Sequence, residues 1–81
     1  MRLPRDLSGP ELVKALAKLG YQTTRQTGSH IRLTTTQQGQ HHLTIPNHAS
    51  LRIGTLAAIL SEVADHFQIS RDSLLEKLFG K

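Results

Sequence analysis

The chain has 81 residues, with 10 Lys and Arg against 6 Asp and Glu and no Cys, which gives a formal net charge of +4. This length fits one small domain over residues 1–81, and the lack of Cys excludes a disulfide scaffold, a thiolate metal site and a thiol nucleophile. No apolar run is long enough to span a bilayer, and residues 1–6 lack the apolar stretch of a signal peptide. We therefore expect a single cytoplasmic domain that does not contact the membrane.

The positive charge is concentrated in the first part of the chain. Residues 1–32 carry a net charge of +4, residues 33–61 carry +1 and residues 62–81 carry −1. Such a basic region favours a polyanion partner such as nucleic acid, although many small domains of similar charge bind none. Any polyanion-binding face is thus predicted to come from the first half of the sequence.

The first predicted helix covers Pro10–Leu19. Ser8 and Glu11 have the spacing of a capping box, in which each side chain accepts a hydrogen bond from the other residue's backbone amide. Gly20 supplies a helix stop. Between these signals the apolar residues recur at helical spacing, as Leu12, Leu16 and Leu19 with Val13 and Ala15.

Three strands are predicted next, over Tyr21–Gln26, 30–34 and Gln40–Ile45, joined by turns at 27–29 and 37–39. The alternation of apolar and polar residues sets the register of the second and third strands. Pairing Leu33 with Leu43 places the apolar residues of both strands on one face, whereas a slip by one residue would set Leu33 opposite a threonine. The opposite, open face then carries His30, Arg32, Thr34, His42 and Thr44.

The last third of the chain is predicted to hold a loop at 47–53, a helix from Gly54 to Phe67 and a short helix capped by Ser70. The element order is therefore helix, three strands, helix and a short extra C-terminal helix. This order predicts an α+β fold with a three-stranded antiparallel sheet, which has helices on one face and water or a partner on the other.

His30 is the residue with the clearest potential for chemistry. It follows a glycine turn at the start of a strand, and Arg32 lies two residues on, hence on the same face. A histidine can move a proton near neutral pH, and an arginine can hold a phosphate with two hydrogen bonds. Together they are typical of half of a metal-free ribonuclease site. The alternative is a polar strand residue that serves only solubility.

The other histidines fit structural roles better. His41 and His42 are adjacent in a strand, so their side chains point to opposite faces and cannot share a metal ion. His48 follows the third strand and could approach His30 as a second proton-transfer group, or be an ordinary loop residue. His66 is expected to be a helix-end residue favoured by the helix dipole. No carboxylate pair, phosphate-binding glycine loop or nucleophile elbow accompanies them.

The segment Arg25-Gln26-Thr27-Gly28-Ser29-His30 is the most distinctive motif of the sequence. Other segments accompany it in order along the whole chain, namely Leu3–Gly9, Glu11-Leu12, Leu19–Tyr21, Ile45–His48, Gly54–Leu56 and Ile59-Leu60. Together they resemble HicA, a family of small toxins from bacterial and archaeal toxin–antitoxin pairs, whose signature is R-Q-x-G-S-H. The polar second hairpin, Thr34–His42, and the long connection Asp65–Ser70 depart from the family's usual pattern.

This resemblance implies a fold like that of a double-stranded-RNA-binding domain (αβββα) and an endoribonuclease, an mRNA interferase, that cuts mRNA without a metal or another cofactor. Its signature histidine is His30, which the resemblance makes the catalytic residue. It further implies a cognate HicB-like antitoxin that covers His30, with operator DNA bound only through the toxin–antitoxin complex. We expect RNA contacts from Arg25, Gly28, Ser29, Arg32 and His48.

Two other functions stay open at the level of the sequence. One is a double-stranded-RNA-binding module that contacts 2′-OH groups and phosphates without cutting the RNA. Such a module needs Lys or Arg at the start of its last long helix, where this chain has only Arg52 and none over 53–67. The other is an inactive protein whose basic face serves only to bind an acidic antitoxin.

Overall fold

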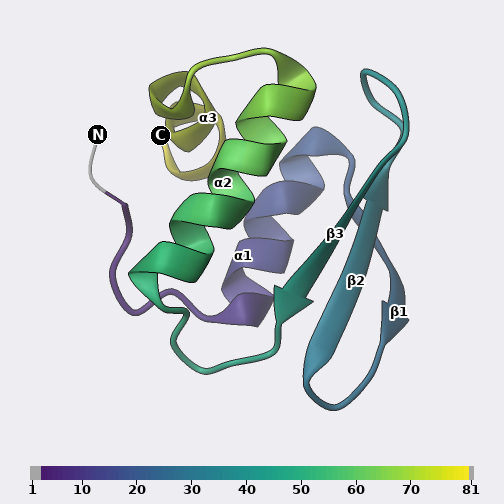
Figure 1. The fold of residues 1–81 in the computed structure, drawn as a ribbon, viewed down its shortest axis with the longest axis vertical. Helices are drawn as coiled ribbons and strands as arrows, with labels where there is room; N and C mark the ends of the chain where they lie inside the picture. The colour runs from purple at the N-terminus through teal and green to yellow at the C-terminus, as the bar shows by residue number, and fades with distance from the viewer. Residues whose placement is uncertain (1–2, 81) are drawn as a thin grey trace.

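The computed structural model describes residues 3–80, so two of the charges counted above, Arg2 and Lys81, and the first residues of the segment considered as a signal peptide lie outside it. A helix, three antiparallel strands and two further helices follow one another (Figure 1). No helix among the described residues has the length and apolar character needed to cross a bilayer. The elements are α1 (Gly9–Leu16), a 3-10 turn (Ala17–Leu19), β1 (Gln22–Gln26), β2 (His30–Thr35), β3 (His41–Pro46), α2 (Ile53–Phe67) and α3 (Arg71–Phe79).

The capping box predicted for the first helix is present. The Glu11 amide donates to the Ser8 hydroxyl at 3.0 Å, and the Ser8 amide donates to the Glu11 carboxylate at 2.9 Å. These bonds hold the pKa of Glu11 below its ordinary value. The predicted span of 10–19 is one α-helix followed by a 3-10 turn, and it ends at Gly20, whose left-handed backbone (φ 83°) suits glycine.

The sheet has the order β1-β2-β3 and the register that the alternation predicted. Leu33 pairs with Leu43, and Ile31 pairs with Ile45. The third strand covers His41–Pro46, so it begins and ends one residue later than expected, and Pro46 still pairs with His30 before the chain leaves the sheet. A proline is tolerated there because β3 is an edge strand.

The helices pack on one face of the sheet and form a single apolar core with it (Figure 1). This α+β arrangement is the predicted fold class. The cover extends over β2 and β3 but not over β1, whose five residues are all exposed. The fully buried part of the core comprises Leu12, Leu16, Tyr21, Leu33, Ile45, Leu56, Leu60, Val63, Leu74, Leu75 and Leu78.

The C-terminal part closes the core as expected, with small differences in its bounds. The second helix begins at Ile53, one residue before the predicted start. Ser70 caps α3 by accepting a hydrogen bond from the Ser73 amide at 3.1 Å. The Lys18 ammonium group donates to the Leu78 carbonyl at 2.7 Å, which ties the end of α3 to the first helical segment.

Candidate nucleic-acid site on the open sheet face

The turn at 27–29 places His30 on the open face of the sheet. The Thr27 amide donates to the His30 carbonyl at 2.9 Å and closes the turn. The side chain of His30 is exposed, and its Nδ1 lies 3.0 Å from the Ser29 hydroxyl. The ring is thus oriented through one nitrogen, while Nε2 makes no hydrogen bond within the described part of the chain.

Hydrogen bonds from Asn47, in the loop after β3, hold the turn at 27–29 in place. The Asn47 amide donates to the Ser29 carbonyl at 2.9 Å, and the Asn47 side chain donates to the Gly28 carbonyl at 3.3 Å. The same loop is tied to the start of α1, since the Gly9 amide donates to the His48 carbonyl at 2.9 Å. The structure therefore brings the His48 loop beside the His30 turn, and the His48 side chain is exposed there.

Gly9 makes this arrangement possible because it has no side chain. A Cβ at this position would overlap the carbonyl oxygen of Pro46, the residue that pairs with His30. The close approach of α1 to the end of β3 therefore depends on glycine. Nothing in the sequence pattern indicates this contact, since the sequence shows Gly9 only as a residue between the capping-box residues Ser8 and Glu11.

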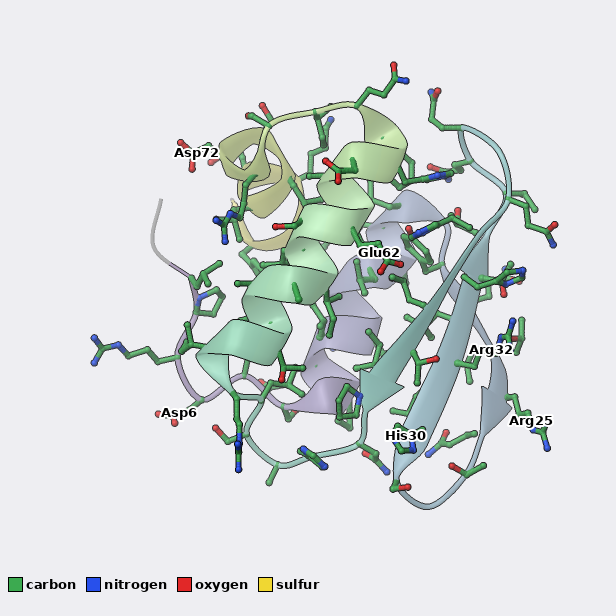
Figure 2. All side chains as sticks on the ribbon, viewed as in Figure 1. Asp6, Arg25, His30, Arg32, Glu62 and Asp72 are labelled. Atoms are coloured by element: carbon green, nitrogen blue, oxygen red, sulfur yellow. The ribbon has the colours of Figure 1, made fainter. Side chains whose placement is uncertain are left out.

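Arg25 and Arg32 lie opposite each other on neighbouring strands (Figure 2). The pairing of β1 with β2 shifts between Thr23 and Arg25, so that Thr24 is an extra, bulged residue. Because Arg32 alternates with the buried Ile31 and Leu33, its side chain is on the open face, and Arg25 shares that face as its partner. The predicted site residues Arg25 and Arg32 are thus brought together, next to His30 along β2.

Comparison with known proteins identifies the family. Residues 9–64 match the model of the family described as HicA toxin of bacterial toxin-antitoxin, and this stretch is more than half of the chain. The protein belongs to the HicA toxin family. No curated protein and no solved structure matches the chain. The matched stretch of this HicA protein contains α1, the whole sheet and the turn that carries His30, and membership of the family implies a cognate antitoxin as partner.

The adjacent histidines of this HicA chain point to opposite faces, as predicted. His42 lies on the open face, where its Nδ1 is 2.7 Å from the Thr34 hydroxyl. His41 faces the helices, where its Nε2 lies 3.1 Å from the Glu62 carboxylate. Within residues 3–80, no three His, Asp or Glu side chains are placed so that they could hold a metal ion together.

A side-chain cluster at the far end of the sheet was not predicted from the sequence. With its Nε2–H donating to Glu62, His41 accepts the hydroxyl of the buried Tyr21 at Nδ1, over 2.7 Å. Burial raises the pKa of Tyr21 to about 12, and the Glu62 carboxylate adds to the rise. The His66 ring stacks on His41 at 4.5 Å between centroids and donates from Nε2 to the Gln37 carbonyl at 2.9 Å. His66 therefore holds the β2–β3 turn, a role that its place in the helix does not reveal.

Proposed function

We propose that this HicA toxin is an endoribonuclease that cuts mRNA and that His30 transfers the proton. The observation that supports this most directly is the state of His30, which is exposed and oriented through Nδ1 while Nε2 is left open. Membership of a toxin family supports an RNA target, and the neighbouring Arg32 supplies a positive charge on the same face. Its mRNA substrate places the activity in the cytoplasm.

The proposed reaction uses the 2′-hydroxyl of the RNA as the nucleophile. In the tautomer whose Nδ1–H donates to Ser29, the His30 Nε2 lone pair can take the 2′-OH proton. The 2′ oxygen then forms a bond to phosphorus, the bond from phosphorus to the 5′ oxygen breaks, and a proton goes to the leaving 5′ oxygen. Arg32 would stabilise the charge that builds on the phosphate oxygens, and His48 is the candidate for the second proton transfer. No cofactor takes part in this scheme.

The same exposed face is the proposed binding site of the antitoxin. A HicB-like protein that covers His30 would stop cleavage by excluding RNA from the face. Operator DNA would be bound only through the toxin–antitoxin complex. Gly28 and Ser29 would contact the RNA because they form the turn that presents His30.

The test is cleavage of a single-stranded RNA by the purified chain in the presence of EDTA. We expect cleavage to survive EDTA and to fall by roughly 10²–10⁴-fold in His30→Ala. His42→Ala is the matched control, because His42 is exposed on the same face and its side chain hydrogen-bonds only to Thr34 among residues 3–80. Equal losses in both variants, or loss of cleavage by the unchanged protein in EDTA, would contradict the proposal.

The same experiment separates the two alternative functions. A duplex-binding module would retard double-stranded RNA without cutting any RNA. An inactive partner of the antitoxin would leave RNA unaffected and bind only the antitoxin. The sequence around the start of α2 disfavours the duplex-binding module, since Arg52 is the one Lys or Arg between positions 52 and 65.

A further inference from the structure

The bulge in β1 changes the face on which Arg25 lies. Thr23 pairs with Leu33, so regular pairing would set Arg25 opposite Ile31, on the side of the sheet that faces the helices. The extra residue Thr24 moves the partner of Arg25 to Arg32 and its side chain to the open face. Bulges commonly re-aim a side chain in this way near functional sites.

Nothing among residues 3–80 accounts for the placement of Arg25 opposite Arg32. Like charges directly opposite each other on neighbouring strands are destabilising. Neither guanidinium has an ion-pair or hydrogen-bond partner among residues 3–80. The bulge also serves no packing purpose that the core reveals, since every residue of β1 is exposed. An anion from outside the chain would remove the repulsion.

We propose that Arg25 and Arg32 together bind one phosphate of a single-stranded RNA, next to the phosphate that is cut at His30. This inference rests on the proposed ribonuclease function for the identity of its ligand. Two guanidinium groups match the oxygens of one phosphate with parallel hydrogen bonds. Arg32 is two strand residues from His30, roughly 7 Å along β2, which is comparable to one nucleotide of an extended strand.

A single strand fits this surface better than a duplex. The two arginines lie on the open face of the sheet, opposite the helices, so one chain of nucleotides can follow β2 from Arg32 to His30. A duplex-binding domain of this fold would need further cations at the start of α2, where this chain has only Arg52. The paired site therefore assigns the substrate to the single-stranded class.

The shared phosphate can be tested with a 2′-O-methyl oligonucleotide, which lacks the nucleophile and cannot be cut by the proposed reaction. Its affinity is measured by fluorescence anisotropy over a range of salt concentrations for the unchanged protein, Arg25→Gln, Arg32→Gln and the double variant. We expect each single substitution to weaken binding about five- to tenfold at low salt, and the second to add less than the first. The slope of the logarithm of the binding constant against the logarithm of the salt concentration should become less negative by about 0.7 in the double variant. This change corresponds to the loss of one phosphate contact.

Two arginines on separate phosphates would give additive losses and about twice that change in slope, which would overturn the shared site. Lys14→Gln is the matched control, because it removes one exposed positive charge from α1 on the helix side and should leave the slope unchanged.

Arg25→Glu provides a second readout that does not depend on RNA. It places a carboxylate opposite Arg32, so we expect thermal stability to stay equal or rise while oligonucleotide binding falls. A fall in stability would show that Arg25 supports the fold and would overturn the inference.

The outcomes for the two proposals are distinguishable. If the arginine variants bind the oligonucleotide normally but lose binding to an acidic antitoxin, the pair is a protein-binding site and the inference is wrong, while the ribonuclease proposal stands. If the variants lose oligonucleotide binding as expected but the unchanged protein cuts no RNA, the ribonuclease proposal is wrong and the phosphate site stands.

Discussion

The two ends of the sheet are held together in different ways. The β1–β2 turn, the loop after β3 and the start of α1 lie toward the same end of the molecule (Figure 1). At this His30 end they are joined through backbone groups, with the Asn47 amide donating to the Ser29 carbonyl and the Gly9 amide to the His48 carbonyl. At the other end, side chains make the connections, and Glu62 points from α2 toward the sheet (Figure 2). That end depends on Tyr21, His41 and His66.

The difference shows how one residue type can serve two purposes in one small domain. His41 uses both ring nitrogens to link a tyrosine and a carboxylate, so neither nitrogen is available to a substrate. The His30 side chain takes little part in stabilising the turn around it, because backbone hydrogen bonds stabilise that turn instead. Every residue type except proline supplies both a backbone donor and a backbone acceptor for such bonds. An exposed side chain can therefore react without loosening the fold.

The largest expected effect comes from disturbing the backbone connections at Gly9. Gly9→Ala would force α1 and the end of β3 apart, because the added methyl group overlaps the Pro46 carbonyl. We expect a loss of about 3 kcal/mol in the free energy of unfolding, measured with urea, and a lower rate of RNA cleavage because the His30 turn shifts.

Gly54→Ala is the control for this prediction. A Cβ at Gly54 meets nothing within 4 Å, so alanine should be neutral or stabilising by up to roughly 0.5–1 kcal/mol. Equal losses in the two variants would mean that the His30 end does not depend on the close approach of the two backbones.

The elements set by local patterns could be predicted from the sequence. The capping box of α1 needs only Ser8 and Glu11, and the register of β2 with β3 follows from alternating apolar residues such as Leu33 and Leu43. The same alternation correctly placed His30 and Arg32 on the open face. The role of His30 in cleavage, and the RNA contacts of the other site residues, stay predictions.

The remaining features depend on contacts that no local pattern encodes. The bulge at Thr24 could not be foreseen because β1 is polar throughout, so no apolar alternation defines its register. Tyr21 and His41 meet although 20 positions separate them in the chain, and His66 reaches a carbonyl 29 positions away. Only the packed structure brings these groups together.

The next largest effect is expected at the side-chain end, in Tyr21→Phe. The substitution removes the hydroxyl that His41 accepts and leaves the ring in the core, so we expect a loss of about 1–2 kcal/mol in the free energy of unfolding. RNA cleavage should be unchanged, because the turn that carries His30 lies at the opposite end of the sheet (Figure 1). A large fall in cleavage would show that the two ends are coupled.

The same variant should alter the response to alkaline pH. The pKa of Tyr21 is about 12 in the folded protein and roughly 10 in an unfolded chain, so between these values the folded state keeps a proton that the unfolded state releases. Stability should therefore fall as the pH rises from about 10 to 12, and this decline should be shallower in Tyr21→Phe. Because the chain has one tyrosine, phenolate absorbance reports its ionisation directly.

The smallest effect is expected in Asn47→Ala, which removes one side-chain hydrogen bond at the His30 end. The Asn47 side chain donates to the Gly28 carbonyl at 3.3 Å, but its backbone amide still donates to Ser29 at 2.9 Å after the substitution. We expect a change below about 0.5 kcal/mol in the free energy of unfolding and RNA cleavage close to that of the unchanged protein. Tyr21→Phe also removes one hydrogen bond, yet that bond is part-buried, and its loss leaves Nδ1 of His41 without the Tyr21 hydroxyl. If Asn47→Ala and Tyr21→Phe lost equal free energy of unfolding in urea, backbone hydrogen bonds would not be the main support of the His30 turn. The contrast between the two ends of the sheet would then disappear.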